Sequence, residues 1–429
     1  MTVKVFRRLR QATSQATTGF DLPLVPFPYK LGILLILPRS MEPMNAPSSR
    51  LDVIDALRGF AIVSIMLLHN IEHFDFYFSP SGLPEWLKLI DKMIWDSMFF
   101  LFGGKSYAIF ALLFGITFYI QWHSREQRGE DFRPRFAWRL ALLLAFGLFN
   151  SLFYQGDILS IYAVLGFALI PVARLRSGTV LAIAVILLLQ PYAWLEFFQA
   201  LPNPDEKLAD PASWAYFGRT TEYMTNGSIF DVWWGNLTNG KVAALRWSWE
   251  NGRIFQIPAL FMLGMLAGRK GVFKTSAENK TFWLRTLVIA ALAFIPLYLL
   301  KSNPESWNVG QAVQRPLLVI VTSWSNLAFM LVLVSGFALL FYFWRWLAFF
   351  SPLGKMSMTS YVVQSIVGTW IYYGFGLGMY QYTGASYALA IGIVLALLQR
   401  QFSVWWLKSH KQGPLETLWH RATWMGAPR

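Results

Sequence analysis

Two ionisable side chains share one face of the first strongly apolar segment. Arg58 and His69 are eleven residues apart in a run that begins near Val53. In an α-helix this spacing returns to within about 20° of the same face and separates the two residues by about 16 Å along the axis. An imidazole can remove a proton from a hydroxyl or amine near neutral pH, and a guanidinium can bind phosphate. The spacing therefore predicts a polar stripe with His69 as a general base.

Neighbouring polar residues support this interpretation. Asp55 lies three residues before Arg58 and can pair with it one helical turn away, and Asn70 follows His69 directly. A simpler alternative is that Arg58 extends to the membrane interface and that His69 is a hydrogen-bonded interfacial histidine. The shared face favours the functional hypothesis, in which Asp55, Arg58, His69 and Asn70 belong to a catalytic site.

The segments that carry these residues have the composition of a membrane protein. The chain of 429 residues is 55% hydrophobic and only 14% charged, with a mean hydropathy of +0.41. Soluble domains carry about 25% charged residues. Apolar runs of about 20 residues, the length that crosses a bilayer, recur without the alternation of a β-barrel. The sequence therefore predicts an all-α, polytopic integral membrane helical bundle.

The apolar runs and their flanking charges predict a topology. A further segment near 86–101 contains Lys88, Asp91, Lys92 and Asp96 and is expected to be an amphipathic or re-entrant helix. Basic loops alternate with acidic loops, which places both termini in the cytoplasm of a bacterial inner membrane. About ten spans are expected, at residues 53–71, 105–122, 136–153, 158–173, 179–198, 254–268, 284–300, 317–343, 357–377 and 385–407.

Composition also excludes several functions. The net charge of +14 arises largely from short basic loops between spans, so we expect membrane lipid and no nucleic acid as a partner. The chain has no cysteine, which excludes disulfides, thiolate catalysis and cysteine-based metal sites. We expect a disordered or mis-started cytoplasmic tail at 1–49, an N-terminal membrane half at 50–268 and a C-terminal membrane half at 269–425.

Several short motifs resemble those of a superfamily of transmembrane acyltransferases. The chain looks most like the YeiB-type proteins, whose N-terminal half is similar to heparan-α-glucosaminide N-acetyltransferase. The resemblance covers about residues 50–425, and motifs in a fixed order are more specific than any one of them. The motifs are DALRGFA at 55–61, GKSYAIF at 104–110, GDIL at 156–159 followed by Tyr162, GKMSMTSY at 354–361 followed by Gln364 and Ser365, and GPLE at 413–416.

The resemblance implies an acyltransferase that uses acyl-CoA, such as acetyl-CoA, and no metal. YeiB-type proteins usually carry Asn eleven residues after the signature arginine, where this chain has His69. OafA-type O-acyltransferases, which are more distant relatives, have His at this spacing. The resemblance therefore supports His69 as the base that activates an acceptor hydroxyl or amine.

Other residues complete this hypothesis. Asn70, or Ser357 and Tyr361, could donate hydrogen bonds to the thioester oxyanion. Residues expected to hold the CoA phosphates are Arg58, Arg125, Arg135, Arg139 and Lys355. Residues expected to meet a small-molecule or glycan acceptor from the other side of the membrane are Glu250, Arg253 and Asp157. Each also has a structural alternative: Asp157 can cap a helix, Lys355 can anchor a span, and Glu250 with Arg253 can form an interfacial pair.

Two other classes of function stay open at this stage. A transporter or flippase would use the same polar stripe as a substrate path. A membrane scaffold would make the stripe incidental. The sequence does not define the acceptor, the acyl chain length or the oligomeric state, for which a homodimer is one option.

Overall fold

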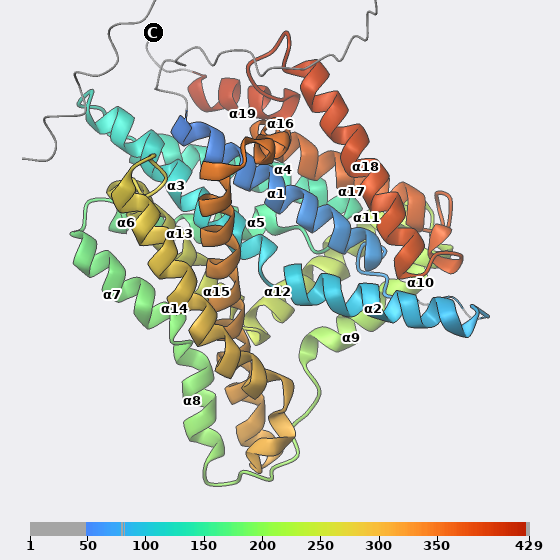
Figure 1. Ribbon diagram of the computed structural model, residues 1–429. Helices are drawn as coiled ribbons and strands as arrows, with labels where there is room; N and C mark the ends of the chain where they lie inside the picture. The colour runs from blue at the N-terminus through green and yellow to red at the C-terminus, as the bar shows by residue number, and fades with distance from the viewer. Residues whose placement is uncertain (1–48, 79, 81, 426–429) are drawn as a thin grey trace, which may run out of the picture. The chain divides into compact units, whose positions relative to one another are not determined.

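Helices form the framework of the described chain, and no strand occurs among its residues (Figure 1). The computed structural model describes residues 49–78, 80 and 82–425. The expected tail at 1–49 lies outside the described residues except for Ser49, where α1 begins. The α-helices are α1 (Ser49–Ile71), α2 (Glu85–Phe102), α3 (Ser106–Glu126), α4 (Arg133–Phe153), α5 (Ile158–Gly166), α6 (Leu169–Val172), α7 (Ser177–Leu188), α8 (Pro191–Ala200), α9 (Ala212–Gly218), α10 (Thr220–Asn226), α11 (Ile229–Gly235), α12 (Lys241–Glu250), α13 (Arg253–Lys270), α14 (Ala277–Ser302), α15 (Gln311–Phe343), α16 (Ser351–Lys355), α17 (Ser357–Tyr372), α18 (Ala385–Trp406) and α19 (Pro414–Trp424). A π-helical turn covers Asn236–Gly240, and 3₁₀ turns cover Pro304–Trp307, Arg345–Phe350 and Met379–Gln381.

Length and composition of the helices confirm a polytopic helical membrane protein. Within the described residues, seven segments are long and apolar enough to cross a bilayer: Asp52–Ile71, Glu85–Glu126, Arg133–Phe153, Ser177–Ala200, Ala277–Ser302, Gln311–Phe343 and Ala385–Trp406. The remaining expected spans correspond to α5 with α6, to α13 and to α17. These helices are shorter or less apolar, and α5, α13 and α17 are largely buried against other helices.

The structure locates the segment near 86–101 and the position expected to divide the N-terminal from the C-terminal membrane half. The segment near 86–101 forms α2, which is separated from α3 by a short turn at 103–105. On α2, Asp91 accepts a hydrogen bond of 2.7 Å from the backbone N–H of Ser386, which opens α18. The boundary expected after residue 268 falls in the last turn of α13, within the one compact unit to which the described residues belong.

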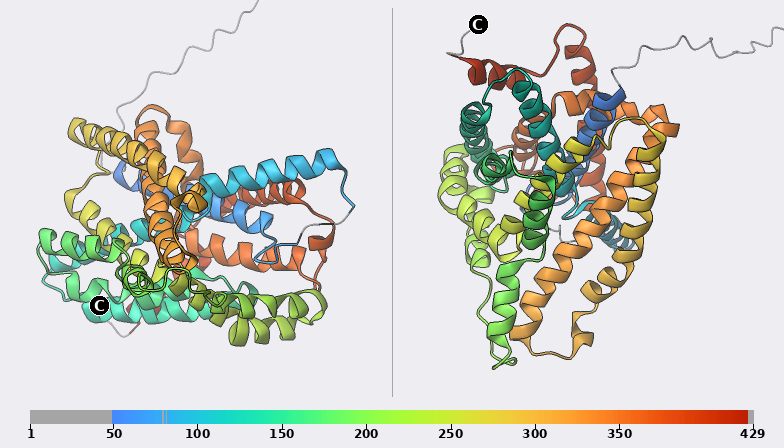
Figure 2. Two further views of the ribbon diagram at one scale, coloured as in Figure 1. Left: turned by 90° about the horizontal axis from the view of Figure 1, so that it is seen from below. Right: turned by 90° about the vertical axis from the view of Figure 1, so that its left-hand side faces the viewer.

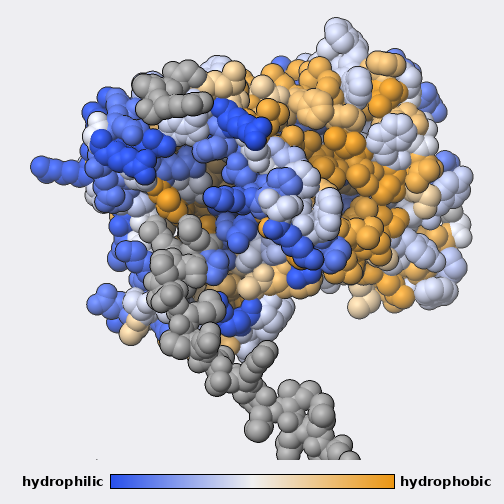
Figure 3. Space-filling model, turned by 90° about the horizontal axis from the view of Figure 1, so that it is seen from above, coloured by the Kyte–Doolittle hydropathy of each residue, from blue (hydrophilic) through white to orange (hydrophobic). Residues whose placement is uncertain are grey.

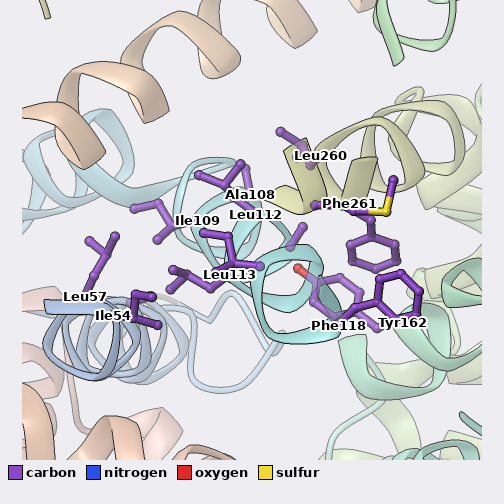
Figure 4. Packing of buried hydrophobic residues seen from close by; sticks show 14 of the residues in the cluster. Ile54, Leu57, Ala108, Ile109, Leu112, Leu113, Phe118, Tyr162, Leu260 and Phe261 are labelled. Carbon is purple, nitrogen blue, oxygen red and sulfur yellow. The ribbon is translucent and has the colours of Figure 1, made fainter. Parts of the chain in front are cut away.

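The apolar core lies where α1, α3, α5 and α13 meet. Figure 4 shows Leu57 of α1, Leu113 of α3 and Phe261 of α13 among the side chains packed there. Gly115 of α3 and Gly264 of α13 each face the backbone of the other helix so closely that a Cβ atom would clash. Small residues let membrane helices approach in this way, and the contact fixes α3 beside α13.

A second close contact joins α1 to α16. A Cβ on Gly59 would meet the backbone carbonyl of Phe350, and a Cβ on Gly354 would meet the backbone carbonyl of Asp55. Glycine at both positions therefore brings the two backbones together. The contact sets Gly354, and with it Lys355, next to the turn of α1 that carries Arg58.

The outward face of α14 is apolar and suited to lipid. Helix α14 packs along α15, which also contacts α8, as Figure 2 shows. Few side chains of α14 are buried, and its exposed ones include Leu284, Ile289, Leu292 and Leu299. In a membrane protein such a face contacts acyl chains.

Polar groups gather at the end of the bundle where α16 and α19 lie. Seen from above in Figure 3, hydrophilic side chains cover one part of the surface and hydrophobic side chains the other. Helix α19 packs against α4 and α17. It therefore covers the ends of two helices that belong to the site described next.

Candidate functional site

A cavity of about 510 Å³ opens beside Arg58 and is lined by α1, α3, α4, α5, α17 and α19. We call it the basic cavity because five of its lining residues carry a basic side chain: Arg58, Arg125, Arg139, Lys355 and His420. Four of these five were expected from the sequence to hold phosphates. Helix packing brings them together from α1, α3, α4 and α16, although they are far apart in the chain.

Arg58 is held by three partners at the wall of the basic cavity. Its Nη1 lies 2.9 Å from Asp55 Oδ1, its Nη2 donates to Thr117 Oγ1 at 3.0 Å, and Nη1 also reaches the carbonyl of Gly354 at 3.4 Å. The pair with Asp55 has the spacing that the sequence predicts. The contact of Asp55 described here is with Arg58, so this carboxylate orients the guanidinium.

Arg139 is a buried cation without a buried anion. Its residue is 9% exposed, Nη1 donates to Thr423 Oγ1 at 3.3 Å, and the guanidinium lies 4.0 Å from the Trp419 ring. Among the residues that the structure describes, no carboxylate lies within ion-pair distance of Arg139. Burying an unpaired charge is costly, so this arrangement favours an anionic ligand in the basic cavity.

The other expected phosphate contacts divide into two groups. Arg125 lines the cavity, pairs with Glu130 at 2.8 Å and lies 4.0 Å from the Trp424 ring. Lys355 also lines the cavity and is exposed. Arg135 does not line it, because its Nη1 donates to the carbonyl of Thr423 at 2.8 Å. Arg135 thus holds the end of α19, and the expectation that it faces the ligand is not supported by its position.

The inner part of the basic cavity is apolar and follows the stripe of α1. Ile62 and Ile65 line it on the same helical face as Arg58. Tyr361 of α17 borders the same region, and its hydroxyl accepts a hydrogen bond of 3.2 Å from the backbone N–H of Ile158. His69, the next residue on the stripe, lies one turn beyond Ile65 and does not line the cavity.

His69 belongs to a separate polar group at the C-terminal end of α1. Its Nδ1 lies 3.3 Å from Glu72 Oε2 and 3.1 Å from the hydroxyl of Tyr154. The Tyr154 hydroxyl also lies 3.3 Å from Asp75 Oδ1, and Tyr77 donates to Glu72 Oε1 at 3.3 Å. We call these five residues the His69 cluster. A carboxylate that accepts from Nδ1–H leaves Nε2 free to take a proton, which is the tautomer that a general base needs.

A strained turn builds the His69 cluster. His73, Phe74 and Asp75 have φ values of 49°, 56° and 70°, which L-residues adopt at a cost of about 1–2 kcal/mol each. The Phe74 ring fits against Gly368 of α17, where any side chain would clash with it. Backbone strain of this kind concentrates at functional sites. Here it turns the chain back after α1, so that Asp75 reaches Tyr154.

Burial changes the protonation of this turn. Burial, together with the charge of Glu72, raises the pKa of Asp75 to about 7, although His69, Tyr154 and Arg253 act in the opposite direction. Asp75 and Tyr154 are not among the site residues expected from the sequence. Their only sequence signal was an acidic pair three residues apart directly after an apolar run, which is also common in loops.

Asn70 does not join the His69 cluster. It is fully buried, its Nδ2 donates to the carbonyl of Met66 at 2.8 Å, and its Oδ1 accepts from the Tyr372 hydroxyl at 3.0 Å. Its Cβ packs next to Gly392 of α18. Asn70 therefore ties α1 to α17 and α18, and a role as an oxyanion donor finds no support in this geometry.

The three expected acceptor residues occupy separate places. Asp157 is fully buried and caps α5 by accepting from the backbone N–H of Ser160 at 2.8 Å, with Lys241 Nζ 3.6 Å from its carboxylate. Glu250 accepts from the backbone N–H of Ser213 at 3.1 Å. Arg253 lies 4.1 Å from the Tyr107 ring and 4.0 Å from the Trp247 ring. No hydrogen bond or ion pair joins the three within the described part of the chain.

Comparison with known proteins places this chain in a family. A family model described as protein of unknown function (DUF418) matches residues 267–426. The uncharacterized protein YeiB of Escherichia coli (strain K12) is 25% identical over 397 residues, which cover 86% of this chain and 95% of YeiB. The uncharacterized protein YxaH of Bacillus subtilis (strain 168) is 30% identical over 412 residues, covering 90% of this chain and 97% of YxaH. The chain belongs to this YeiB-type family.

The YeiB-type protein builds its site from both parts of the chain. The DUF418 match includes α17 and α19, whereas Arg58, Arg139 and His69 precede it and are covered only by the full-length relatives. An uncharacterized 39.9 kDa protein of Bacillus acidopullulyticus is 25% identical over 406 residues, covering 90% of this chain and 96% of that protein. No solved structure matches the YeiB-type chain.

Proposed function

We propose that this YeiB-type protein is an acyltransferase that binds acyl-CoA in the basic cavity and transfers the acyl group to a hydroxyl or amine at the His69 cluster. The observation that carries the proposal is the stripe of α1. The stripe begins at Arg58, in the cavity that also holds the buried Arg139, which has no ion pair within the described residues. It continues along Ile62 and Ile65 and ends at His69, which is hydrogen-bonded to Glu72.

The two ends of the cavity match the two ends of acyl-CoA. The nucleotide end of CoA carries phosphates, which guanidinium groups bind through charge-assisted hydrogen bonds. Arg139 and Arg125 supply such groups in the cavity lining, and Lys355 adds an exposed charge. The apolar inner part, which includes Ile62 and Ile65, suits the pantetheine arm and a short acyl group.

The His69 cluster supplies the acid–base chemistry of the transfer. His69 Nε2 takes the proton from the acceptor, whose oxygen or nitrogen then bonds to the thioester carbonyl carbon. The carbon–sulfur bond breaks, and the proton passes from His69 to the departing thiolate, which leaves as CoA. Glu72 stabilises the transient imidazolium, and a base positioned in this way accelerates proton transfer about 10²–10⁴-fold.

Tyr361 is the best-placed donor to the developing oxyanion. Tyr361 lines the cavity, and its hydroxyl accepts from the backbone N–H of Ile158 and donates to no acceptor within the described residues. Its proton is therefore available to the thioester carbonyl oxygen. Because the cavity ends at Ile65, the proposal requires the wall formed by Ile65 and Tyr361 to open and admit the thioester.

Sidedness follows from the charges. Basic loops mark the cytoplasmic side, so acyl-CoA would enter from the cytoplasm of a bacterial cell and the acceptor from the opposite face of the inner membrane. This arrangement would carry an acyl group across the membrane without moving CoA.

The test uses purified protein in vesicles with radiolabelled acetyl-CoA. Acyl transfer that is lost in His69→Ala and kept in His410→Ala, an exposed histidine, would support the proposal. Uptake of a labelled solute without thioester cleavage would instead favour a transporter that uses the same stripe. Failure of the protein to bind acetyl-CoA would refute the proposal.

A further inference from the structure

Helix α19 brings aromatic side chains to the wall of the basic cavity. Trp419, His420 and Trp424 all line it. The helix as a whole is polar, with a charged or polar residue at most other positions, so these two indoles are its main apolar contribution to the site. Both indoles pack against the apolar core and also line the cavity.

The start of α19 is fixed to α17. Glu416 accepts hydrogen bonds from the backbone N–H groups of Met358 and Thr359 at 2.7 and 3.1 Å, and from the Thr359 hydroxyl at 2.6 Å. A carboxylate at a helix N-terminus is favourable because it satisfies unpaired N–H groups. This anchor determines which side of α19 faces the cavity.

The rest of α19 is held by α4. The Trp419 indole N–H donates to the carbonyl of Arg139 at 3.1 Å, and the Trp138 indole N–H donates to the carbonyl of Ala422 at 3.0 Å. Arg135 donates to the carbonyl of Thr423 at 2.8 Å. These bonds hold the Trp419 indole directly and fix the backbone just before Trp424.

Each indole lies against one of the cavity arginines. The Arg139 guanidinium is 4.0 Å from the centre of the Trp419 ring, and the Arg125 guanidinium is 4.0 Å from the centre of the Trp424 ring, which also has the Arg135 guanidinium at 5.3 Å. Within the described residues, Arg139 is the one cation over the Trp419 ring, and a single guanidinium covers only one face of a ring. An indole next to a guanidinium thus offers two interactions to one ligand: stacking for a planar base and ion pairing for a phosphate attached to it.

We propose that Trp419 and Trp424 form the base-binding part of this site, and that they stack on the base of a purine nucleotide whose phosphates bind Arg139 and Arg125. This inference rests on the proposed function, which gives the cavity a nucleotide-containing ligand. It adds that α19, near the C-terminus, recognises the base of that ligand.

The test compares two phosphate-containing anions, of which only one carries a base. Binding of adenosine 3′,5′-bisphosphate and of inorganic pyrophosphate to the full-length protein is measured by calorimetry. We expect the bisphosphate to bind about tenfold more tightly, as one stacked base contributes on this scale. Trp424→Leu and Trp419→Leu should reduce its affinity to that of pyrophosphate, whereas Trp424→Phe should retain most of it because phenyl rings also stack.

Controls separate this inference from the proposed function. Trp405→Leu, at an exposed position of α18 outside the cavity, should leave both affinities unchanged. Equal affinities of the wild type for both anions, or a preference that survives both leucine variants, would overturn the base-binding role and leave the anion site in place. If neither anion binds, the proposed function is overturned as well.

Discussion

The imidazole of His69 lies 3.3 Å from the carboxylate of Glu72, one helical turn beyond the last residue of α1 that lines the basic cavity. Two groups with different chemistry thus occupy the two ends of one helix face. In the proposed function, Arg58 belongs to the phosphate-binding end and His69 to the acid–base end. The predictions below test each end separately.

Glu72→Gln should lower the rate of acyl transfer about 10–100-fold without weakening acetyl-CoA binding. The amide keeps the size of the side chain but removes the charge that orients Nδ1–H and stabilises the imidazolium. Steady-state rates and calorimetric affinities measured on the same preparation distinguish the two effects. Glu85→Gln, at an exposed position at the start of α2, is the matched control and should change neither.

Arg139→Gln should weaken acetyl-CoA binding about 10–100-fold, because a desolvated phosphate loses a charge-assisted partner. The unfolding temperature of the ligand-free protein should stay unchanged or rise, since a buried cation without a carboxylate partner is itself unfavourable. Arg128→Gln, on the exposed loop after α3, should leave the affinity unchanged. A large fall in ligand-free stability with normal affinity would make Arg139 a structural residue instead.

Stability should depend on pH through Asp75. The folded protein keeps this carboxyl protonated up to a pKa of about 7, whereas the unfolded chain releases the proton near the ordinary value of 3.8. Folding therefore binds a proton between these values, and stability falls as pH rises from about 4 to about 7. Thermal unfolding in detergent should show a higher midpoint at pH 5 than at pH 8.

Asp75→Asn should reduce that difference, because an amide stays neutral at both pH values. Asp131→Asn provides the control, since this exposed carboxyl pairs with Arg133 and has a pKa lowered to about 2. It should leave the difference between pH 5 and pH 8 intact. An equal pH dependence in Asp75→Asn and wild type would show that Asp75 titrates normally.

Gly354→Ala should destabilise the protein by about 1–3 kcal/mol or more, because its methyl group would meet the backbone carbonyl of Asp55. Separation of α1 from α16 should also displace Lys355 and weaken acetyl-CoA binding. Gly336→Ala on α15 is the control, since a Cβ there meets no neighbouring atom. Similar unfolding midpoints for the two variants would contradict the close contact of α1 with α16.

Much of the framework could be predicted because lipid imposes a simple rule. A segment without polar side chains must form hydrogen bonds within itself, and runs of about 20 apolar residues therefore become helices. The pair of Asp55 and Arg58 also follows from spacing alone, since residues three apart on a helix are neighbours. Both inferences use only local geometry.

The rest of the site depends on contacts that spacing does not encode. Asp75 reaches Tyr154 through three consecutive left-handed residues, and no periodic pattern predicts such a turn. Arg135 and Arg139 differ by one helical turn, yet only Arg139 faces the cavity, because α19 covers Arg135. The position of α19 depends in turn on Glu416, some 280 residues later in the sequence.

The most direct test of the central claim is the release of CoA from acetyl-CoA by the wild type and by His69→Gln. Because the chain contains no cysteine, a thiol reagent reports only the CoA that is released. We predict that the wild type releases CoA in the presence of an acceptor and that His69→Gln binds acetyl-CoA with normal affinity but releases CoA at least 100-fold more slowly. Equal release by both proteins would contradict the assignment of His69 as the base.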